Sequence, residues 1–151
     1  MIILTGGLNT KDHRKLGVAG ELRVASELLL RGFSPSSNFL DEGADLTLEN
    51  GLRLQVKSSR LTSKPDHYLF NFKSWKAHES RSKGVRLQLA SDLKGIDYVI
   101  LWGVDTDVFY IIPADLVRGK MTINIVIHRC RRRPDAIDYT SYVNQWDLLR
   151  R

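Results

Sequence analysis

The chain has 151 residues, which is enough for one domain with a hydrophobic core but small for two. Its formal net charge of +6 favours an anionic partner, and its single cysteine, Cys130, excludes an internal disulfide and agrees with a reducing compartment. The first residues form too short an apolar run for a signal peptide, and no run approaches the length that spans a membrane. The expected location is therefore the cytoplasm.

The first predicted element is a helix from Lys11 to Arg31. Gly32 follows it, and glycine is typical of the position after the end of a helix. The apolar residues that recur at helical spacing should form its buried stripe: Leu16, Ala19, Leu22, Ala25, Leu28 and Leu29.

Glu21 lies at the edge of that stripe. Gly17 and Gly20 leave no side-chain bulk around it, which allows the helix to approach a sheet closely. A carboxylate in such a position is costly unless a cation lies near it. Glu21 can pair with a neighbour such as Arg14 or Arg23, or it can reach a metal site, and we favour the second interpretation.

Two strands joined by a short turn are predicted within residues 43–57. A three-residue loop, Glu49-Asn50-Gly51, would pair Asp45 with Gln55 and gather the leucines on one face, whereas a two-residue turn would move Asp45 to the opposite face. Three-residue loops that end in glycine are common, so we predict this register. Asp45, Gln55 and Lys57 then share one face and can hold a divalent metal and a water beside a phosphate. An ordinary amphipathic hairpin would show the same pattern.

Four further strands and a closing helix complete an α/β pattern. The strands are predicted over residues 67–73, 96–102, 108–112 and 120–128, and the helix over residues 141–149, with Tyr142, Trp146 and Leu149 on one buried face. The run 96–102 is almost continuously apolar, as expected for a central strand that is covered on both faces. Pro113 should end the pairing of the strand before it. Residues 74–86 fit either a recognition loop or a short helix.

A helix with Glu21, a strand with Asp45 and a strand with Gln55-Val56-Lys57 follow one another in an order that resembles the PD-(D/E)XK nuclease superfamily. The likeness is greatest to a small single-domain branch, common in cyanobacteria, that includes an intron-encoded homing endonuclease. It extends over most of residues 16–116 and depends on residues 20–33, 54–59 and 94–113. The resemblance implies one nuclease domain over residues 1–151 with a basic segment at 128–151. It also implies a restriction-endonuclease-like core, in which a central mixed β-sheet is flanked by helices.

The resemblance also implies a role for each site residue. Asp45 would be the main Mg²⁺ ligand, Val56 would add its backbone carbonyl, and Glu21 would contact the metal directly or through water. Gln55 stands where the superfamily more often has glutamate and would supply a neutral oxygen. Lys57 would orient or help deprotonate the attacking water and offset charge on the phosphate. Because glutamine lacks a negative charge, the metal should bind less tightly unless Glu21 compensates.

Clustered basic residues agree with a nucleic-acid partner. The residues predicted to contact DNA lie on the first helix, after Lys57 and before Pro134: Lys11, Arg14, Lys15, Arg60, Lys64, Arg129, Arg131, Arg132 and Arg133. Arginine suits bidentate recognition of phosphate and guanine.

The activity implied by the resemblance is Mg²⁺-dependent, site-specific cleavage of double-stranded DNA, as by a homing endonuclease with a long target. Cutting both strands requires two copies of so small a site, so a homodimer or homotetramer is expected. Two alternatives stay open. One is a Holliday-junction resolvase, which would cleave branched DNA, and the other is a DNA-binding module in which Gln55 marks lost catalysis.

Overall fold

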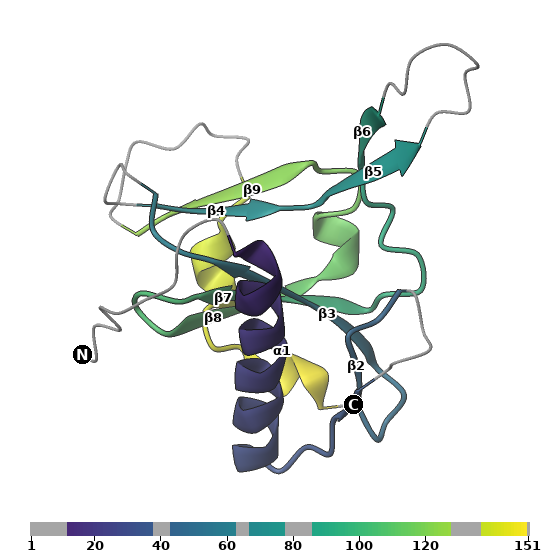
Figure 1. The fold of residues 1–151 in the computed structure, drawn as a ribbon. Helices are drawn as coiled ribbons and strands as arrows, with labels where there is room; N and C mark the ends of the chain where they lie inside the picture. Colours follow the sequence, from purple (N-terminus) through teal and green to yellow (C-terminus); the bar gives the residue numbers. More distant parts are fainter. Residues whose placement is uncertain (1–11, 38–42, 63–66, 78–85, 128–136, 151) are drawn as a thin grey trace.

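The computed structural model describes residues 12–37, 43–62, 67–77, 86–127 and 137–150 (Figure 1). A five-stranded sheet with the order β1-β2-β3-β7-β8 forms its centre. The strands are β1 (Ser36–Ser37), β2 (Leu46–Thr47), β3 (Arg53–Ser59), β7 (Tyr98–Gly103) and β8 (Val108–Pro113). β3 and β7 are parallel and the other neighbours are antiparallel, so the sheet is mixed, as predicted.

Different elements cover the two faces of this sheet. The helix α1 (His13–Leu30) packs on one face, where Val24 and Leu28 join a cluster with Leu54 and Ile100. The other face packs against a two-stranded sheet of β4 (His67–Asn71) and β9 (Thr122–Val126) and a short 3-10 helix, η1 (Ala114–Leu116). All residues of β7 are buried for this reason. In the described residues an α-helix thus flanks only one face of the central sheet. The other face is covered by strands, because buried residues alternate with more exposed ones over residues 67–71 and 122–126.

The hairpin has the predicted register. Leu46 pairs with Leu54, and the N–H of Leu48 donates to the carbonyl of Leu52 at 2.9 Å. Gly51 has a φ of +85°, which lets glycine close the three-residue loop without strain. This register turns Leu46, Leu48, Leu52 and Leu54 into the core.

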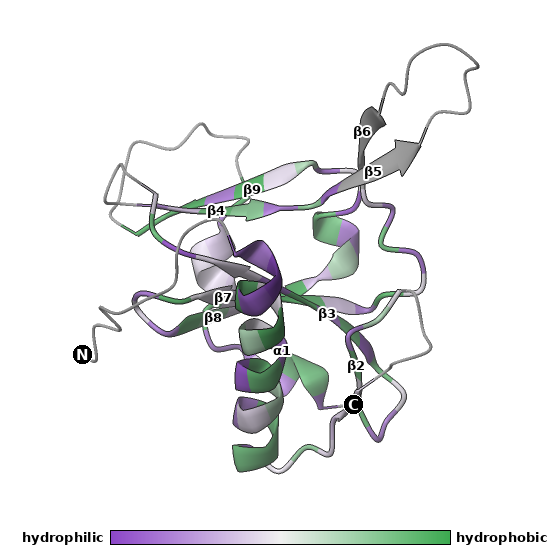
Figure 2. Ribbon diagram, in the orientation of Figure 1, coloured by the Kyte–Doolittle hydropathy of each residue, from purple (hydrophilic) through white to green (hydrophobic). Residues whose placement is uncertain are grey.

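The helix begins at His13 and ends at Leu30, inside the predicted bounds, and has only part of the predicted buried stripe. Leu28 is buried and Leu16, Ala19 and Ala25 are partly buried, whereas Leu22 and Leu29 are 67% and 61% exposed. The prediction for these two leucines was wrong. Gly20 and Val24 face the sheet instead, so the opposite side of the helix remains apolar and open, and Figure 2 shows hydrophobic residues on most turns of α1.

The end of the chain differs from the predicted single helix. Two 3-10 helices, η2 (Tyr139–Tyr142) and η3 (Trp146–Leu149), are separated by Asn144, which has a φ of +52° and donates its N–H to the carbonyl of Phe109 at 2.9 Å. Trp146 and Leu149 pack in the cluster beneath α1, while Tyr142 packs on the other side of the sheet. Tyr142 therefore does not share a face with the other two.

The segment without a clear sequence pattern forms strands. β5 (Lys73–Ala77) and β6 (Arg86–Ala90) pair as a two-stranded sheet that extends away from the central sheet in Figure 1. Residues 78–85 lie outside the described part. The strands predicted over residues 96–102, 108–112 and 120–128 are present as β7, β8 and β9 with slightly different bounds, whereas the one predicted over residues 67–73 ends at Asn71, and Lys73 begins β5. Pro113 is included in β8 opposite Tyr98 rather than ending the pairing before it. Among the described residues, no helix has the length and apolar character needed to cross a membrane.

Candidate active site

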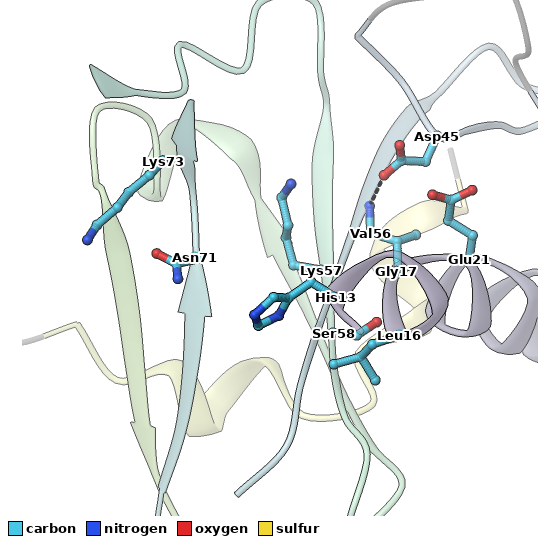
Figure 3. Close-up of a pocket in the computed structure, with 10 residues that line it drawn as sticks. All are labelled: His13, Leu16, Gly17, Glu21, Asp45, Val56, Lys57, Ser58, Asn71 and Lys73. Atoms are coloured by element: carbon cyan, nitrogen blue, oxygen red, sulfur yellow. Dashed lines mark hydrogen bonds between the residues drawn. The ribbon is translucent and has the colours of Figure 1, made fainter. Parts of the chain in front are cut away.

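A pocket of about 420 Å³ opens where the N-terminal half of α1 meets β3 (Figure 3). Glu21 enters it from α1, Asp45 from the residue before β2, and Val56 and Lys57 from β3. The pocket thus brings together four of the five residues that the sequence assigned to the metal and the reaction.

Asp45 completes the edge of the sheet beside this pocket. Its N–H donates to the carbonyl of Leu54 at 2.9 Å, and its Oδ2 accepts from the N–H of Val56 at 2.7 Å. Because β2 begins only at Leu46, no strand residue pairs with Val56 there, and the carboxylate supplies the missing acceptor. In an extended strand the N–H and the carbonyl of one residue point to the same edge, so the Val56 carbonyl is also directed to the side of Asp45.

Glu21 reaches the pocket because α1 lies close to β3. A Cβ atom at Gly20 would overlap Ser58 Oγ and would lie 3.2 Å from Ser58 Cβ, so glycine favours this close approach. Arg23, one of the two arginines that could have paired with Glu21, instead binds Glu27 at 2.9 Å and Asp107 at 2.8 Å. Glu21 is left facing the pocket.

Burial raises the pKa of Asp45 above its ordinary value, while the hydrogen bond from Val56 and the charge of Lys57 act in the opposite direction. Burial likewise raises the pKa of Glu21, and the negative charge of Asp45 adds to this shift while Lys57 opposes it. The charge of Asp45 therefore disfavours the charged form of Glu21, and partial burial disfavours the charged form of both carboxyl groups. A bound cation would relieve both.

The donors fit a hard divalent cation. Two carboxylates and a backbone carbonyl are oxygen ligands, and Mg²⁺ prefers oxygen and retains several waters. The described residues contain no group of three or more His, Cys, Asp or Glu side chains that could hold a metal ion. A metal here would depend on the pair Glu21 and Asp45, on the Val56 carbonyl and on water.

Gln55 does not line this pocket. It lines a neighbouring hollow of about 520 Å³ together with Arg53, Lys94 and Gly95. Its Oε1 is buried and has no hydrogen-bond partner within the described ranges. Gln55 and Lys57 share a face of β3, but Gln55 lies nearer the start of the strand, where the chain before β7 adjoins it.

The predicted DNA contacts are described only in part. Arg14 and Lys15 are exposed on the first turn of α1, and Lys15 forms an ion pair with Asp12 at 3.1 Å. Arg60 is paired with Asp105 at 3.3 Å. The remaining predicted contacts lie outside the described residues: Lys11, Lys64, Arg129, Arg131, Arg132 and Arg133.

Four polar residues of the pocket were not assigned to the site from the sequence, and one of them is Ser58, which follows Lys57 on β3. The other three, His13, Asn71 and Lys73, line the pocket together with the residues above. Lys73 belongs to a basic stretch of the sequence, which was its only signal. No local pattern indicates that the end of β4 lies beside the start of α1.

Comparison with known proteins identifies the family. A family model described as PD-(D/E)XK endonuclease matches residues 10–149. The fold is similar to that of a bacterial homing endonuclease, I-Ssp6803I, with a TM-score of 0.64 and 20% sequence identity over 90% of this chain and 89% of that one. No curated protein sequence matches the chain. Because the family model covers nearly the whole length, the chain belongs to the PD-(D/E)XK endonuclease family and is a nuclease.

Proposed function

We propose that this nuclease is a Mg²⁺-dependent, site-specific endonuclease that cuts both strands of DNA at a long target, as a homing endonuclease does. The observation that carries the proposal is the single pocket shared by Glu21, Asp45, Val56 and Lys57. Support for the homing role comes from the similarity of fold to a bacterial homing endonuclease.

Each residue of the pocket would have a separate role in the reaction. Asp45, Glu21 and the Val56 carbonyl would hold the cation, which when bound supplies positive charge to the scissile phosphate and makes a bound water more acidic. Lys57 would hold the attacking water and offset charge on the phosphate. Attack of this water on phosphorus breaks the bond to the 3′ oxygen and leaves a 5′ phosphate and a 3′ hydroxyl.

Gln55 is proposed as a neutral oxygen donor beside this site. Its Oε1 has no partner in the described part of the chain and lies on the same strand face as Lys57. A neutral donor leaves fewer negative charges around the metal than glutamate would, so Mg²⁺ affinity depends more heavily on Glu21 and Asp45.

We infer that two copies act together, as a homodimer or homotetramer. Val18, Leu22, Ala25 and Leu29 are spaced four, three and four residues apart on α1, and the side chains of Val18, Leu22 and Leu29 are more than half exposed. This is the spacing with which two helices pack along a seam. A second copy of α1 is therefore the proposed occupant of this stripe, defined here as Val18, Leu22, Ala25 and Leu29.

The test is cleavage of a randomised duplex library in Mg²⁺, with EDTA, Asp45→Asn and Lys57→Ala as controls. Cutting at one recoverable long sequence by the wild type alone is the expected result. Salt-sensitive binding without any cutting would overturn the proposal in favour of a DNA-binding module. Preferential cutting of an added four-way junction would overturn it in favour of a resolvase.

A further inference from the structure

The active-site pocket has a second end that the proposed reaction does not use. In Figure 3, Glu21 and Asp45 lie on one side of Lys57, and Asn71 and Lys73 lie on the other, with His13 near Lys57. Glu21 and Asp45 are the only acidic residues that line the pocket within the described part of the chain. One end therefore carries the carboxylates and the other carries basic and amide groups.

The three residues of this second end are exposed and come from separate elements. His13 is the first residue of α1, Asn71 is the last residue of β4, and Lys73 is the first residue of β5. None of their side chains has a hydrogen-bond or ion-pair partner among the residues that the structure describes. Their donors are available to a ligand.

Phe72 fixes two of these residues in place. It is 1% exposed, its N–H donates to the carbonyl of Met121 at 2.9 Å, and its carbonyl accepts from the N–H of Ser91 at 2.8 Å. Side chains on either side of a residue in extended chain point away from that residue's side chain. The burial of Phe72 therefore turns Asn71 and Lys73 outward to the pocket together.

We propose that His13, Asn71 and Lys73 form a second phosphate subsite, which binds the backbone phosphate next to the scissile one on the same DNA strand. Phosphates follow each other at about 3.4 Å of duplex axis per strand, so a strand whose phosphate lies at Lys57 carries its neighbour along the pocket. Lysine and amide side chains are common phosphate contacts that fix the register of DNA without reading its sequence. Binding there would place the scissile phosphate between Asp45 and Lys57.

This inference rests on the proposed function, because that function identifies the bound strand as the one that is cut. Its first test nevertheless does not require cleavage. A fluorescein-labelled 30-bp duplex of mixed sequence is titrated by anisotropy in EDTA between about 50 and 200 mM KCl, a range in which phosphate contacts change affinity strongly. Each lost phosphate contact should reduce the slope of log affinity against log salt by about 0.9. We expect this reduction for Lys73→Gln and none for Lys120→Gln, a matched change outside the pocket.

Equal slopes for Lys73→Gln and Lys120→Gln would overturn the subsite, whether or not the wild type cuts DNA. A protein that binds with the expected slope change but never cuts would overturn the proposed function and leave the subsite supported. Circular dichroism of each variant checks that the fold is retained.

The second test locates the phosphate. Once the cut position is known, single methylphosphonate linkages replace the phosphates around it, one at a time. Neutralising the adjacent phosphate should weaken wild-type binding several-fold and should have little further effect on a His13→Gln/Lys73→Gln variant. Equal losses for the two proteins at every position would show that these residues do not contact that phosphate.

Discussion

The carboxylate of Asp45 accepts a hydrogen bond from the N–H of Val56 at 2.7 Å, at the edge where β2 has not yet begun to pair with β3. One side chain thus completes the sheet and supplies the proposed main ligand of the site. A substitution that keeps the acceptor but removes the charge separates these two roles.

Asp45→Asn should abolish cleavage while leaving the protein folded and able to bind DNA. The amide oxygen can still accept from Val56, whereas the negative charge that would hold the cation is lost. Asp45→Ala also leaves the Val56 N–H without this acceptor, so its free energy of unfolding should fall by about 1–3 kcal/mol. Urea unfolding measures the stability of each variant, anisotropy measures DNA binding, and a cleavage assay measures activity. Cleavage by Asp45→Asn at the wild-type rate would show that Asp45 is not a metal ligand.

The stability of the metal-free protein should depend on the protonation of the two acids. The pKa values of Asp45 and Glu21 are raised in the folded state, mainly by burial. The folded protein therefore binds more protons than the unfolded chain as pH rises through the ordinary carboxyl range, so the free energy of unfolding falls across that range. In EDTA at neutral pH, Asp45→Asn should be more stable than wild type, and the difference should vanish in acid.

Added Mg²⁺ should make wild type more stable than Asp45→Asn. A ligand that binds only the folded state raises the apparent stability, so the melting temperature of wild type should rise with Mg²⁺ concentration and that of Asp45→Asn should not. Thermal unfolding in EDTA and in Mg²⁺ provides both comparisons. An equal rise for the two proteins would place the ion elsewhere.

Gly20→Ala should disturb both the packing and the site. The added methyl would overlap Ser58 Oγ, so either the serine side chain must turn away, which still leaves its Cβ 3.2 Å from the methyl, or α1 must move away from β3 and carry Glu21 with it. Overpacking of this kind costs about 1–3 kcal/mol. Gly17→Ala is the matched control, because a Cβ there meets nothing within 4 Å and the change should stabilise the helix by about 0.5–1 kcal/mol.

Combining Gly20→Ala with Ser58→Gly tests whether the overlap with Ser58 causes the loss of stability and activity. Removing the serine side chain removes the atoms that the methyl would overlap, so the double variant should recover stability and activity relative to Gly20→Ala alone. Additive losses in urea unfolding would show that the contact between Gly20 and Ser58 is not the origin of the defect.

The hairpin could be predicted from the sequence because two independent constraints agree there. The alternating leucines and the position of Gly51 both specify the same register, so Asp45 was assigned to the correct edge. The buried face of α1 could not be predicted in the same way. The helix carries apolar residues on two faces, and what selects the face toward the sheet is the close approach of Gly20 to Ser58 on a distant strand.

The same limit applies to the site and to the end of the chain. His13 and Lys73 line one pocket although they belong to separate elements, α1 and β5, and no local sequence pattern indicates this arrangement. Trp146 and Leu149 were correctly expected in the core. The separation of the last helix into two pieces depends on the left-handed conformation of Asn144, which no helical spacing reveals.

Asp107→Ala should cost more stability than loss of an ordinary surface ion pair. Asp107 accepts from Arg23 on α1 at 2.8 Å and from the indole N–H of buried Trp102 at 2.7 Å, so it joins the helix to the sheet. Its removal should lower the free energy of unfolding by about 1–3 kcal/mol. Asp115→Ala is the control, because its exposed pair with Arg118 should contribute under about 1 kcal/mol.

The hydrogen bond from Arg23 lowers the pKa of Asp107, with a smaller contribution from Trp102. A lowered carboxyl pKa contributes stability above the ordinary value, and this contribution is lost as pH falls through the folded pKa. The difference between wild type and Asp107→Asn should therefore shrink in acid. A constant difference from neutral pH to strong acid would show that the charge of Asp107 does not stabilise the fold.

The apolar stripe on α1 gives the last prediction. Leu22→Glu should convert the proposed oligomer to monomers, because a charge would be buried at the seam between two copies. Leu30→Glu is the matched control: Leu30 is 80% exposed but lies outside the spacing of the stripe, so it should not change association. Sedimentation velocity measures the mass of each species. A cleavage assay that detects nicked duplex as a product reports whether the monomer cuts only one strand. If wild type and both variants sediment as the same species, α1 is not the interface and the exposed leucines require another explanation.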